Sequence, residues 1–169
     1  PDGLWIGYVA GSRLMKIPVE GGSQTPLATA PSIRGWSWGP GGIVVSSDGR
    51  LMRVPANGGT PVPLAPDATT RGYWPVVLPG GRAVVYATDT ARNGPLGIAD
   101  LSNGRTADVG VSGSYPVGIA GEELVFARQD GSLMAAPFDL RAGRVTGSAR
   151  VVLPDVVGVE GDRRPTQGR

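Results

Sequence analysis

A nine-residue pattern recurs along this chain and limits the folds that are open to it. It reads LMRVPANGG at residues 51–59 and LMKIPVEGG at residues 14–22, a displacement of 37 residues. Fainter copies begin at Leu96 and Leu133. Self-similarity at such a spacing is typical of modular arrays whose units stack to share one core. We therefore expect a series of similar modules.

Glycine and proline mark the boundaries between short apolar runs. The chain has 28 Gly and 16 Pro among 169 residues, a content that approaches the range of disordered sequences. Their order argues against disorder, because turn sequences recur at a spacing of 39 residues, at Pro1-Asp2-Gly3, Pro40-Gly41-Gly42 and Pro79-Gly80-Gly81. Periodic turn residues indicate strands joined by tight turns and not a low-complexity tract.

The second module shows the full unit. Residues 35–38 predict an inner strand with Trp36 and Trp38 on one face and Ser37 on the other. Residues 43–47 have the composition of a strand that is buried on both sides. Asp48-Gly49 predicts a type I′ hairpin, in which both positions need a positive φ. With strands at 51–56 and 61–65, the module is a four-stranded antiparallel meander.

Four strands in about 40 residues are the dimensions of one propeller blade. Aspartates at 48, 89 and 130 repeat the turn position every 41 residues, with Asp130-Gly131 expected to restore the short turn after the longer one at Asp89. Helical periodicity is absent over any window of twelve residues. The predicted fold class is therefore all-β: a β-propeller of about four blades, as part of a larger propeller.

The expected blades occupy residues 1–30, 31–66, 67–111 and 112–155, followed by a tail or the start of a next blade at 156–169. The first blade begins at its second strand, so the chain supplies fifteen strands where four complete blades need sixteen. The last of the fifteen is expected to run from Arg144 to Leu153. Val156–Val159 is one candidate for the missing inner strand. The preferred explanation is that segments outside this sequence supply it. A second copy is a further alternative.

The repeat resembles a known family. Trp-Gly-Pro-Gly-Gly at 38–42, an apolar strand ending in Ser-Asp-Gly-Arg at 47–50, and the motif at 51–59 look like the TolB-type (WD-like) propeller repeat of bacteria. The usual repeat has a Trp-Ser-Pro-Asp-Gly turn and an aliphatic strand that ends in Asp-Gly-Gly. Gly39 replaces the serine and Gly41 the aspartate. The resemblance covers nearly all of residues 1–155 and implies a propeller.

Two segments are similar to a narrower group. Val-Pro-Ala-Asn-Gly-Gly at 54–59 and Leu-Pro-Gly-Gly-Arg at 78–82 resemble propellers that follow the catalytic domain and a membrane helix in many bacterial serine/threonine protein kinases. That resemblance implies a periplasmic or other extracytoplasmic location, while the cytoplasm stays an alternative. The kinase signature motifs themselves are not present in this sequence.

The composition of the chain lacks the residue types that many catalytic mechanisms require. The chain has no His and no Cys, which excludes Ser-His-Asp and Cys-His catalysis, disulfides and the common zinc sites within it. Lys16 is the sole lysine and takes the repeat position of Arg53, which favours a structural pairing. The adjacent acids Glu122 and Glu123 fall in an expected turn. We predict no catalytic residue, no metal site and no cofactor, and hence that the chain is not an enzyme.

The distribution of charged residues indicates which classes of binding partner are expected. Sixteen basic and fourteen acidic residues leave a net charge of +2, and the arginines are spread over the modules. Nucleic-acid binding is not expected, because it needs a concentrated basic stripe. Only Arg163, Arg164 and Arg169 gather, in what is expected to be a solvated tail. No apolar run approaches the ~20 residues of a membrane-spanning helix, so direct insertion is not expected.

The loops that enter the inner strands hold the candidate binding residues. Arginine and aromatic side chains there have the composition of interaction hot spots, and the candidates are Arg34, Trp36, Arg71, Trp74 and Tyr115. The alternative is that Trp36 and Trp38 pack between blades while the two arginines solubilise loops.

The sequence thus predicts a non-catalytic segment that binds a protein or peptide. It would serve as a sensor or scaffold in a bacterial serine/threonine kinase or a TolB-like protein, with the missing blades supplied by the parent chain or by a second copy. The alternative is a propeller accessory to a peptidase-type hydrolase whose catalytic domain is absent from this chain.

Overall fold

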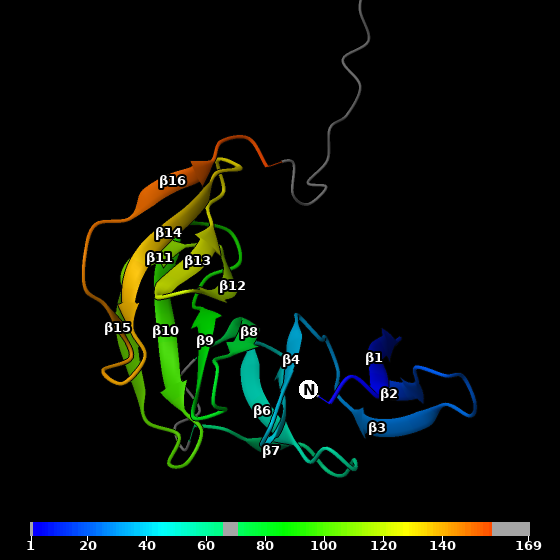
Figure 1. Cartoon of the computed structure of the whole chain (residues 1–169). Helices are drawn as coiled ribbons and strands as arrows, with labels where there is room; N and C mark the ends of the chain where they lie inside the picture. Colours follow the sequence, from blue (N-terminus) through cyan, green and yellow to red (C-terminus); the bar gives the residue numbers. More distant parts are fainter. Residues whose placement is uncertain (1, 66–70, 157–169) are drawn as a thin grey trace, which may run out of the picture.

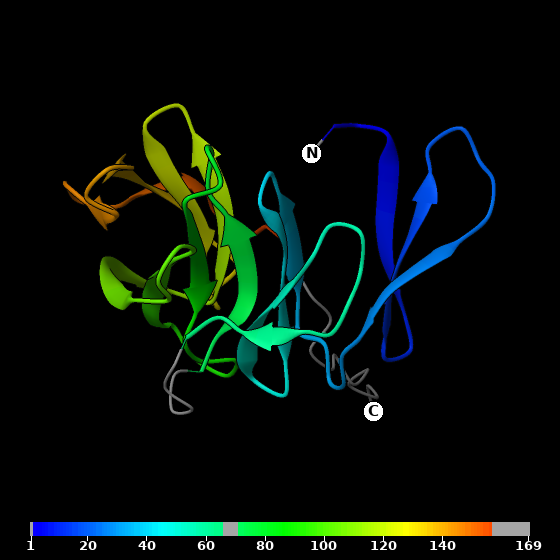
Figure 2. The same cartoon turned by 90° about the horizontal axis from the view of Figure 1, so that it is seen from below.

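The computed structural model describes residues 2–65 and 71–156. Within these residues the regular secondary structure consists of β-strands, which are grouped in four antiparallel sheets. The sheets stand side by side in chain order, from blue to orange (Figures 1 and 2). The all-β propeller prediction is confirmed, as a partial propeller. No helix long and apolar enough to cross a lipid bilayer occurs in the part described.

The first sheet has three strands, as expected for a module that lacks its inner strand. They are β1 (Trp5–Ala10), β2 (Arg13–Pro18) and β3 (Thr25–Thr29), paired in that order. Most of the segment Val156–Val159 and all of Arg163, Arg164 and Arg169 lie outside the described residues.

The second and third sheets are four-stranded meanders. The second contains β4 (Trp36–Gly39), β5 (Gly42–Ser47), β6 (Arg50–Val54) and β7 (Val62–Pro63). The third contains β8 (Tyr73–Val77), β9 (Ala83–Ala87), β10 (Gly94–Asp100) and β11 (Thr106–Gly113). In each sheet the strands pair in chain order, as the repeat predicts.

The fourth sheet departs from the expectation at its outer edge. Its strands are β12 (Tyr115–Ala120), β13 (Glu123–Ala127), β14 (Leu133–Asp139), β15 (Arg144–Val145) and β16 (Arg150–Leu153). The single strand expected from Arg144 to Leu153 is therefore wrong. Two short strands pair with opposite ends of β14 instead. Pro137 of β14 lies between those two pairings; it has no N–H to donate, and its carbonyl accepts a hydrogen bond of 2.8 Å from the Thr146 amide.

Alternate residues of the central strands face opposite neighbours. All six residues of β5 are buried, as its composition predicts. Ile43 and Val45 pack with Leu14 and Leu27 of the first sheet, whereas Val44 packs with residues of the third. The same alternation in β9 sends side chains to the second and fourth sheets. The core consists of these three interfaces between sheets.

The tryptophans of β4 follow the predicted division of faces. Trp36 and Trp38 pack on the first-sheet side. On the opposite face, Ser37 Oγ accepts a hydrogen bond of 3.0 Å from the Val77 amide in the third sheet. A Cβ added at Gly7 would lie 2.4 Å from the Trp36 ring, so the indole occupies the space that glycine leaves.

The two Asp-Gly turns differ. Asp48 and Gly49 have φ values of 50° and 74°, which confirms the type I′ turn between β5 and β6. Asp130 does not adopt a positive φ, and the connection between β13 and β14 spans residues 128–132. There the Asp130 carboxylate accepts hydrogen bonds from the Ser132 amide and hydroxyl. This connection is short, as expected, but it lacks the type I′ form of the Asp48-Gly49 turn, because side-chain bonding to the next residues favours a slightly longer loop.

Packing of the first sheet on the second can be tested by truncating one leucine. Leu14 on β2 is fully buried in the interface, so Leu14→Ala should lower the free energy of unfolding by about 2 to 5 kcal/mol. Leu4, at 64% exposure beside β1, is the matched control, and Leu4→Ala should change stability little. Denaturant unfolding followed by circular dichroism measures both. Equal effects would contradict the interface.

Three aspartates in turns make stability depend on pH. The Ser102 hydroxyl lowers the pKa of Asp100, the Ser132 hydroxyl lowers the pKa of Asp130, and the Ala142 and Arg141 amides lower the pKa of Asp139. Because these pKa values lie below the ordinary 3.8, the carboxylates stabilise the fold above that pH, and the effect is lost as pH falls through the folded values.

We expect unfolding free energy to fall between pH 5 and pH 2, and to fall less in the triple variant Asp100→Asn/Asp130→Asn/Asp139→Asn. Urea unfolding at the two pH values measures the difference. An identical loss in the variant would show that these turns do not carry the pH dependence.

Candidate functional site

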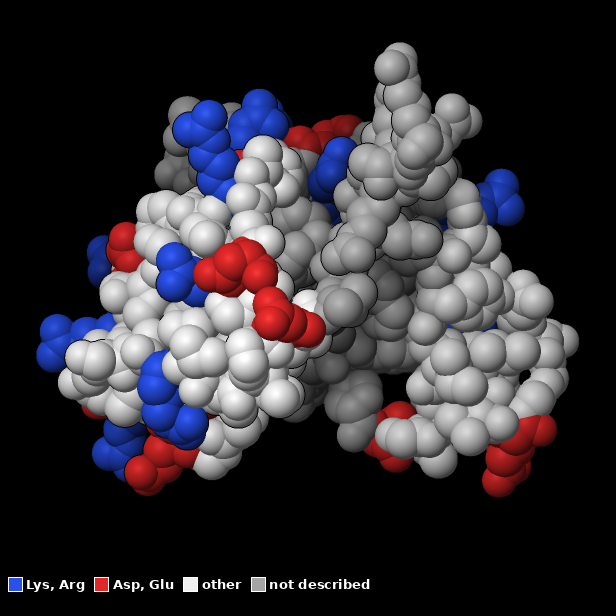
Figure 3. All heavy atoms as spheres, turned by 90° about the horizontal axis from the view of Figure 1, so that it is seen from above, with Lys and Arg blue, Asp and Glu red and all other residues white. Residues whose placement is uncertain are grey.

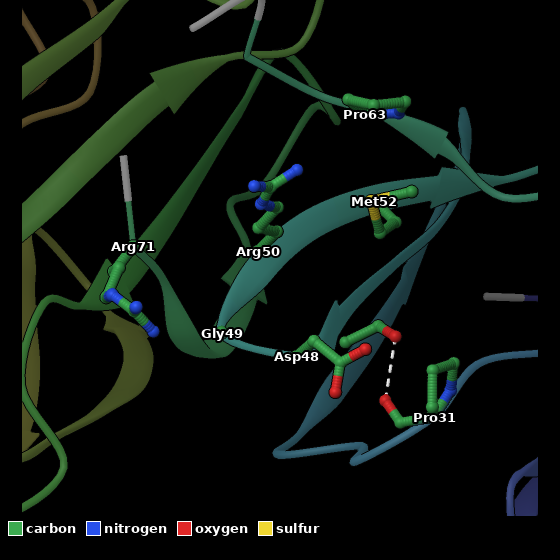
Figure 4. Close-up of a pocket in the computed structure, with 8 residues that line it drawn as sticks. Pro31, Asp48, Gly49, Arg50, Met52, Pro63 and Arg71 are labelled. Carbon is green, nitrogen blue, oxygen red and sulfur yellow. Dashed lines mark hydrogen bonds between the residues drawn. The ribbon is translucent and has the colours of Figure 1, made fainter. Parts of the chain in front are cut away.

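A hollow of about 490 Å³ lies at the hairpin end of the second sheet (Figure 4). We call it the hairpin hollow. Its walls come from the loop after β3, the β5–β6 hairpin, β6, β7 and the loop before β8, which contains Arg71. The lining residues are Pro31, Ser47, Asp48, Gly49, Arg50, Met52, Pro63 and Arg71.

Strand geometry places the β6 residues. Arg50 and Met52 are two residues apart and therefore share a face of the strand. Leu51 between them points the other way, into the interface with the third sheet. Met52 is paired across the ladder with Pro63 of β7, which brings an apolar wall beside the arginine.

Hydrogen bonds hold the loop with Arg71 against the hairpin. The Gly72 amide donates to the Gly49 carbonyl at 3.0 Å, and the buried Ser46 hydroxyl donates to the Gly72 carbonyl at 2.7 Å. Arg71 Nη1 lies 3.5 Å from the Tyr73 hydroxyl. The position of Arg71 beside Gly49, seen in Figure 4, thus follows from main-chain bonds between the second and third sheets.

The hairpin hollow contains two guanidinium groups and one carboxylate, that of Asp48. Arg50 and Arg71 are exposed. Among the described residues neither forms an ion pair, and the pair that does form is Arg150 with Glu123 at 2.6 Å. A guanidinium presents five N–H donors in a planar fork that suits a carboxylate or phosphate. The hollow can therefore accept an anionic group beside an apolar wall.

Two of the sequence-predicted residues come together elsewhere. The rings of Trp74 and Tyr115 lie with centroids 4.0 Å apart, and Tyr73 lies 6.0 Å from Trp74. Trp74 has a φ of 47°, and its amide donates to the Arg34 carbonyl at 2.8 Å. Trp74 also packs against the core between the third and fourth sheets. These contacts join three sheets.

The other predicted residues are dispersed. Arg71 lines the hairpin hollow, whereas the exposed side chain of Arg34 does not. Trp36 packs between the first and second sheets, in agreement with the alternative that it serves the core. Whether any of the five binds a partner stays a prediction.

Sequence reasoning missed Arg50, Met52 and Pro63. A signal for Arg50 was present, because it directly follows the Asp48-Gly49 turn. The end of a hairpin lies at the same edge of its sheet as the loop that enters the next inner strand. Arg50 should on that ground have been grouped with Arg71.

The acidic side chains of the described residues do not gather into a metal-binding group. Glu123 pairs with Arg150, and no group of three or more His, Cys, Asp or Glu that could hold a metal occurs among the residues described. Figure 3 shows basic and acidic side chains interspersed on the face that it presents.

Comparisons with known proteins support the architecture. No protein-family model and no curated sequence matches the chain. A solved structure provisionally assigned as TolB from Agrobacterium tumefaciens is similar over 90% of this chain and 59% of its own, with 14% identity and a TM-score of 0.69. TolB from Acinetobacter baumannii matches over 91% and 42%, with 16% identity and a TM-score of 0.66.

A puromycin hydrolase structure is also similar, over 82% of this chain and 23% of its own, with 20% identity and a TM-score of 0.55. The chain thus spans less than two thirds of each of these proteins. At such identities the likeness shows the fold alone, a β-propeller similar to those of the TolB structures.

The close packing of the turn beside the hairpin hollow can be tested by adding one methyl group at Gly49. A Cβ at Gly49 would lie 2.8 Å from the Tyr73 hydroxyl and 3.0 Å from Arg71 Nη1, at a φ of +74°. Gly49→Ala should therefore cost about 1 to 2 kcal/mol of unfolding free energy. Gly41, which has open space around it, is the control. Thermal unfolding that is alike in Gly49→Ala and Gly41→Ala would contradict the close approach.

Proposed function

We propose that this chain is a non-catalytic interaction segment of a propeller and that its hairpin hollow binds an acidic peptide segment of a partner protein. The observation that carries the proposal is the pair of guanidinium groups, Arg50 and Arg71, without a carboxylate partner among the described residues. An acidic side chain would accept their donors. Met52 and Pro63 would contact the apolar part of the same peptide.

The parent protein belongs to the same proposal. The sequence pattern resembles TolB-type repeats and the propellers of bacterial serine/threonine kinases, and the solved structures with a similar fold include TolB proteins. A sensor or scaffold role outside the cytoplasm is consistent with that resemblance. A kinase domain and a membrane helix in the parent chain would support the kinase form of the proposal.

A second candidate is a propeller that lines or gates the active site of a hydrolase. The similarity to a puromycin hydrolase structure favours this alternative. The chain itself has no His and no Cys for nucleophilic catalysis, so the chemistry would come from another domain. A nucleophile-elbow domain in the parent protein would favour this reading over the first.

The hairpin hollow can be tested with a defined acidic probe. A fluorescein-labelled hexaglutamate peptide should bind the chain with an anisotropy change that weakens as salt is raised. The double variant Arg50→Ala/Arg71→Ala should weaken binding about tenfold or more, equivalent to about 1.4 kcal/mol.

The matched control is Arg105→Ala/Arg141→Ala, which removes the same charge from exposed turns after β10 and β14. Equal weakening in both double variants would indicate a general charge effect and refute the site. A hexalysine peptide that bound as well as hexaglutamate would refute it too.

A further inference from the structure

Lys16, the sole lysine of the chain, is held between two indoles. The residue is only 9% exposed and lies on β2, the middle strand of the first sheet. The Nζ atom lies 4.3 Å from the ring centroid of Trp5 and 5.9 Å from that of Trp38. Trp5 lies on β1 of the first sheet and Trp38 on β4 of the second. The ammonium therefore sits where the two sheets meet.

The ammonium borders a second hollow, of about 270 Å³, which we call the lysine hollow. It is lined by Asp2, Trp5, Lys16, Trp38, Gly39, Pro40, Ala56 and Asn57. The lining residues of the second module lie at the ends of β4 and β6 that are remote from the Asp48-Gly49 turn, and the other three come from the first module. The lysine hollow and the hairpin hollow thus occupy opposite ends of the second sheet.

The hydrogen bonds of Lys16 are incomplete. Nζ donates to the Ala56 carbonyl at 3.3 Å, and an ammonium has three donors. No ion pair to Lys16 forms among the described residues, although burial of a charge is costly without a partner. The faces of Trp5 and Trp38 offset part of that cost. Within the described residues Nζ thus has one hydrogen-bond acceptor, and Lys16 lines the lysine hollow.

We propose that the lysine hollow binds one acidic sugar unit, of the hexuronate class. The sugar carboxylate would accept from the free donors of Lys16, and the apolar face of the ring would pack on an indole. Asn57 would supply an amide for the hydroxyl groups, whereas Oδ1 of Asp2 already accepts a hydrogen bond of 3.0 Å from the Leu4 amide. The volume lies near the small end of ligand pockets, which suits a single ring.

Because the chain contains one lysine, its side chain can be observed directly. Selective ¹³C labelling of lysine gives one side-chain spin system, whose ε-methylene protons should appear upfield because of the indole ring currents. D-glucuronate should shift these signals saturably with a Kd on the order of 1 mM. D-glucose, which lacks the carboxylate, is the matched ligand control and should leave them in place.

Three protein variants complete the experiment, followed by tryptophan fluorescence with the same two sugars. Lys16→Met should abolish the response to glucuronate, and Lys16→Arg should retain it. Arg50→Ala/Arg71→Ala should bind glucuronate as the parent sequence does, which separates this site from the hairpin hollow. If Lys16→Met does not fold, Asn57→Ala, at an exposed position, should weaken glucuronate binding severalfold.

Absence of a saturable lysine shift with glucuronate would overturn the proposal. An equal response to glucose would overturn it as well, because the ammonium would then not recognise the ligand. Glucuronate binding that survives Lys16→Met, or that is lost in the Arg50/Arg71 double variant, would place the sugar elsewhere.

Discussion

The structure depends on strands that pack on both faces at once. In β5 the side chains of Ile43 and Val45 serve one interface and that of Val44 serves the next. Such a strand stabilises the fold only when two further sheets cover it, because a lone sheet would leave one apolar face in water. Each module is therefore stabilised by packing against its neighbours in the series. Gly7, which accommodates the Trp36 ring, shows how closely neighbouring sheets approach.

This packing leaves accessible polar groups mainly at the ends of the strands. The faces of the inner sheets are covered, so accessible polar groups gather in the turns and in the loops between sheets. The hairpin hollow and the lysine hollow lie at opposite ends of the second sheet. Each combines cationic donors with an apolar wall, and in each the cation lacks a carboxylate partner among the described residues. Both arise from juxtaposition of segments from different modules.

The site was less accessible to sequence reasoning than the fold. Arg71 was selected because it lies in a loop, but its neighbours in the hairpin hollow are Arg50 and Met52, from the preceding module. Lys16 is predicted to serve a structural pairing, and it packs against Trp5 and Trp38, two contacts that the repeat pattern does not specify. The order of hairpins and loops is a signal that groups Arg50 with Arg71, whereas the contacts of Lys16 with the two indoles depend on how one sheet rests against the next, which local residue patterns do not specify.

By itself the sequence determined the all-β class, the repeat of about 40 residues, the division of faces in β4 and the type I′ turn at Asp48-Gly49. These features follow from local rules of turn chemistry and alternation. Only the tertiary structure decided the split of the last strand around Pro137, the longer loop at Asp130 and the grouping of side chains in the two hollows. Those outcomes depend on which backbone and side-chain groups come into contact across strands and sheets. These contacts are set by packing between segments that are far apart in the chain.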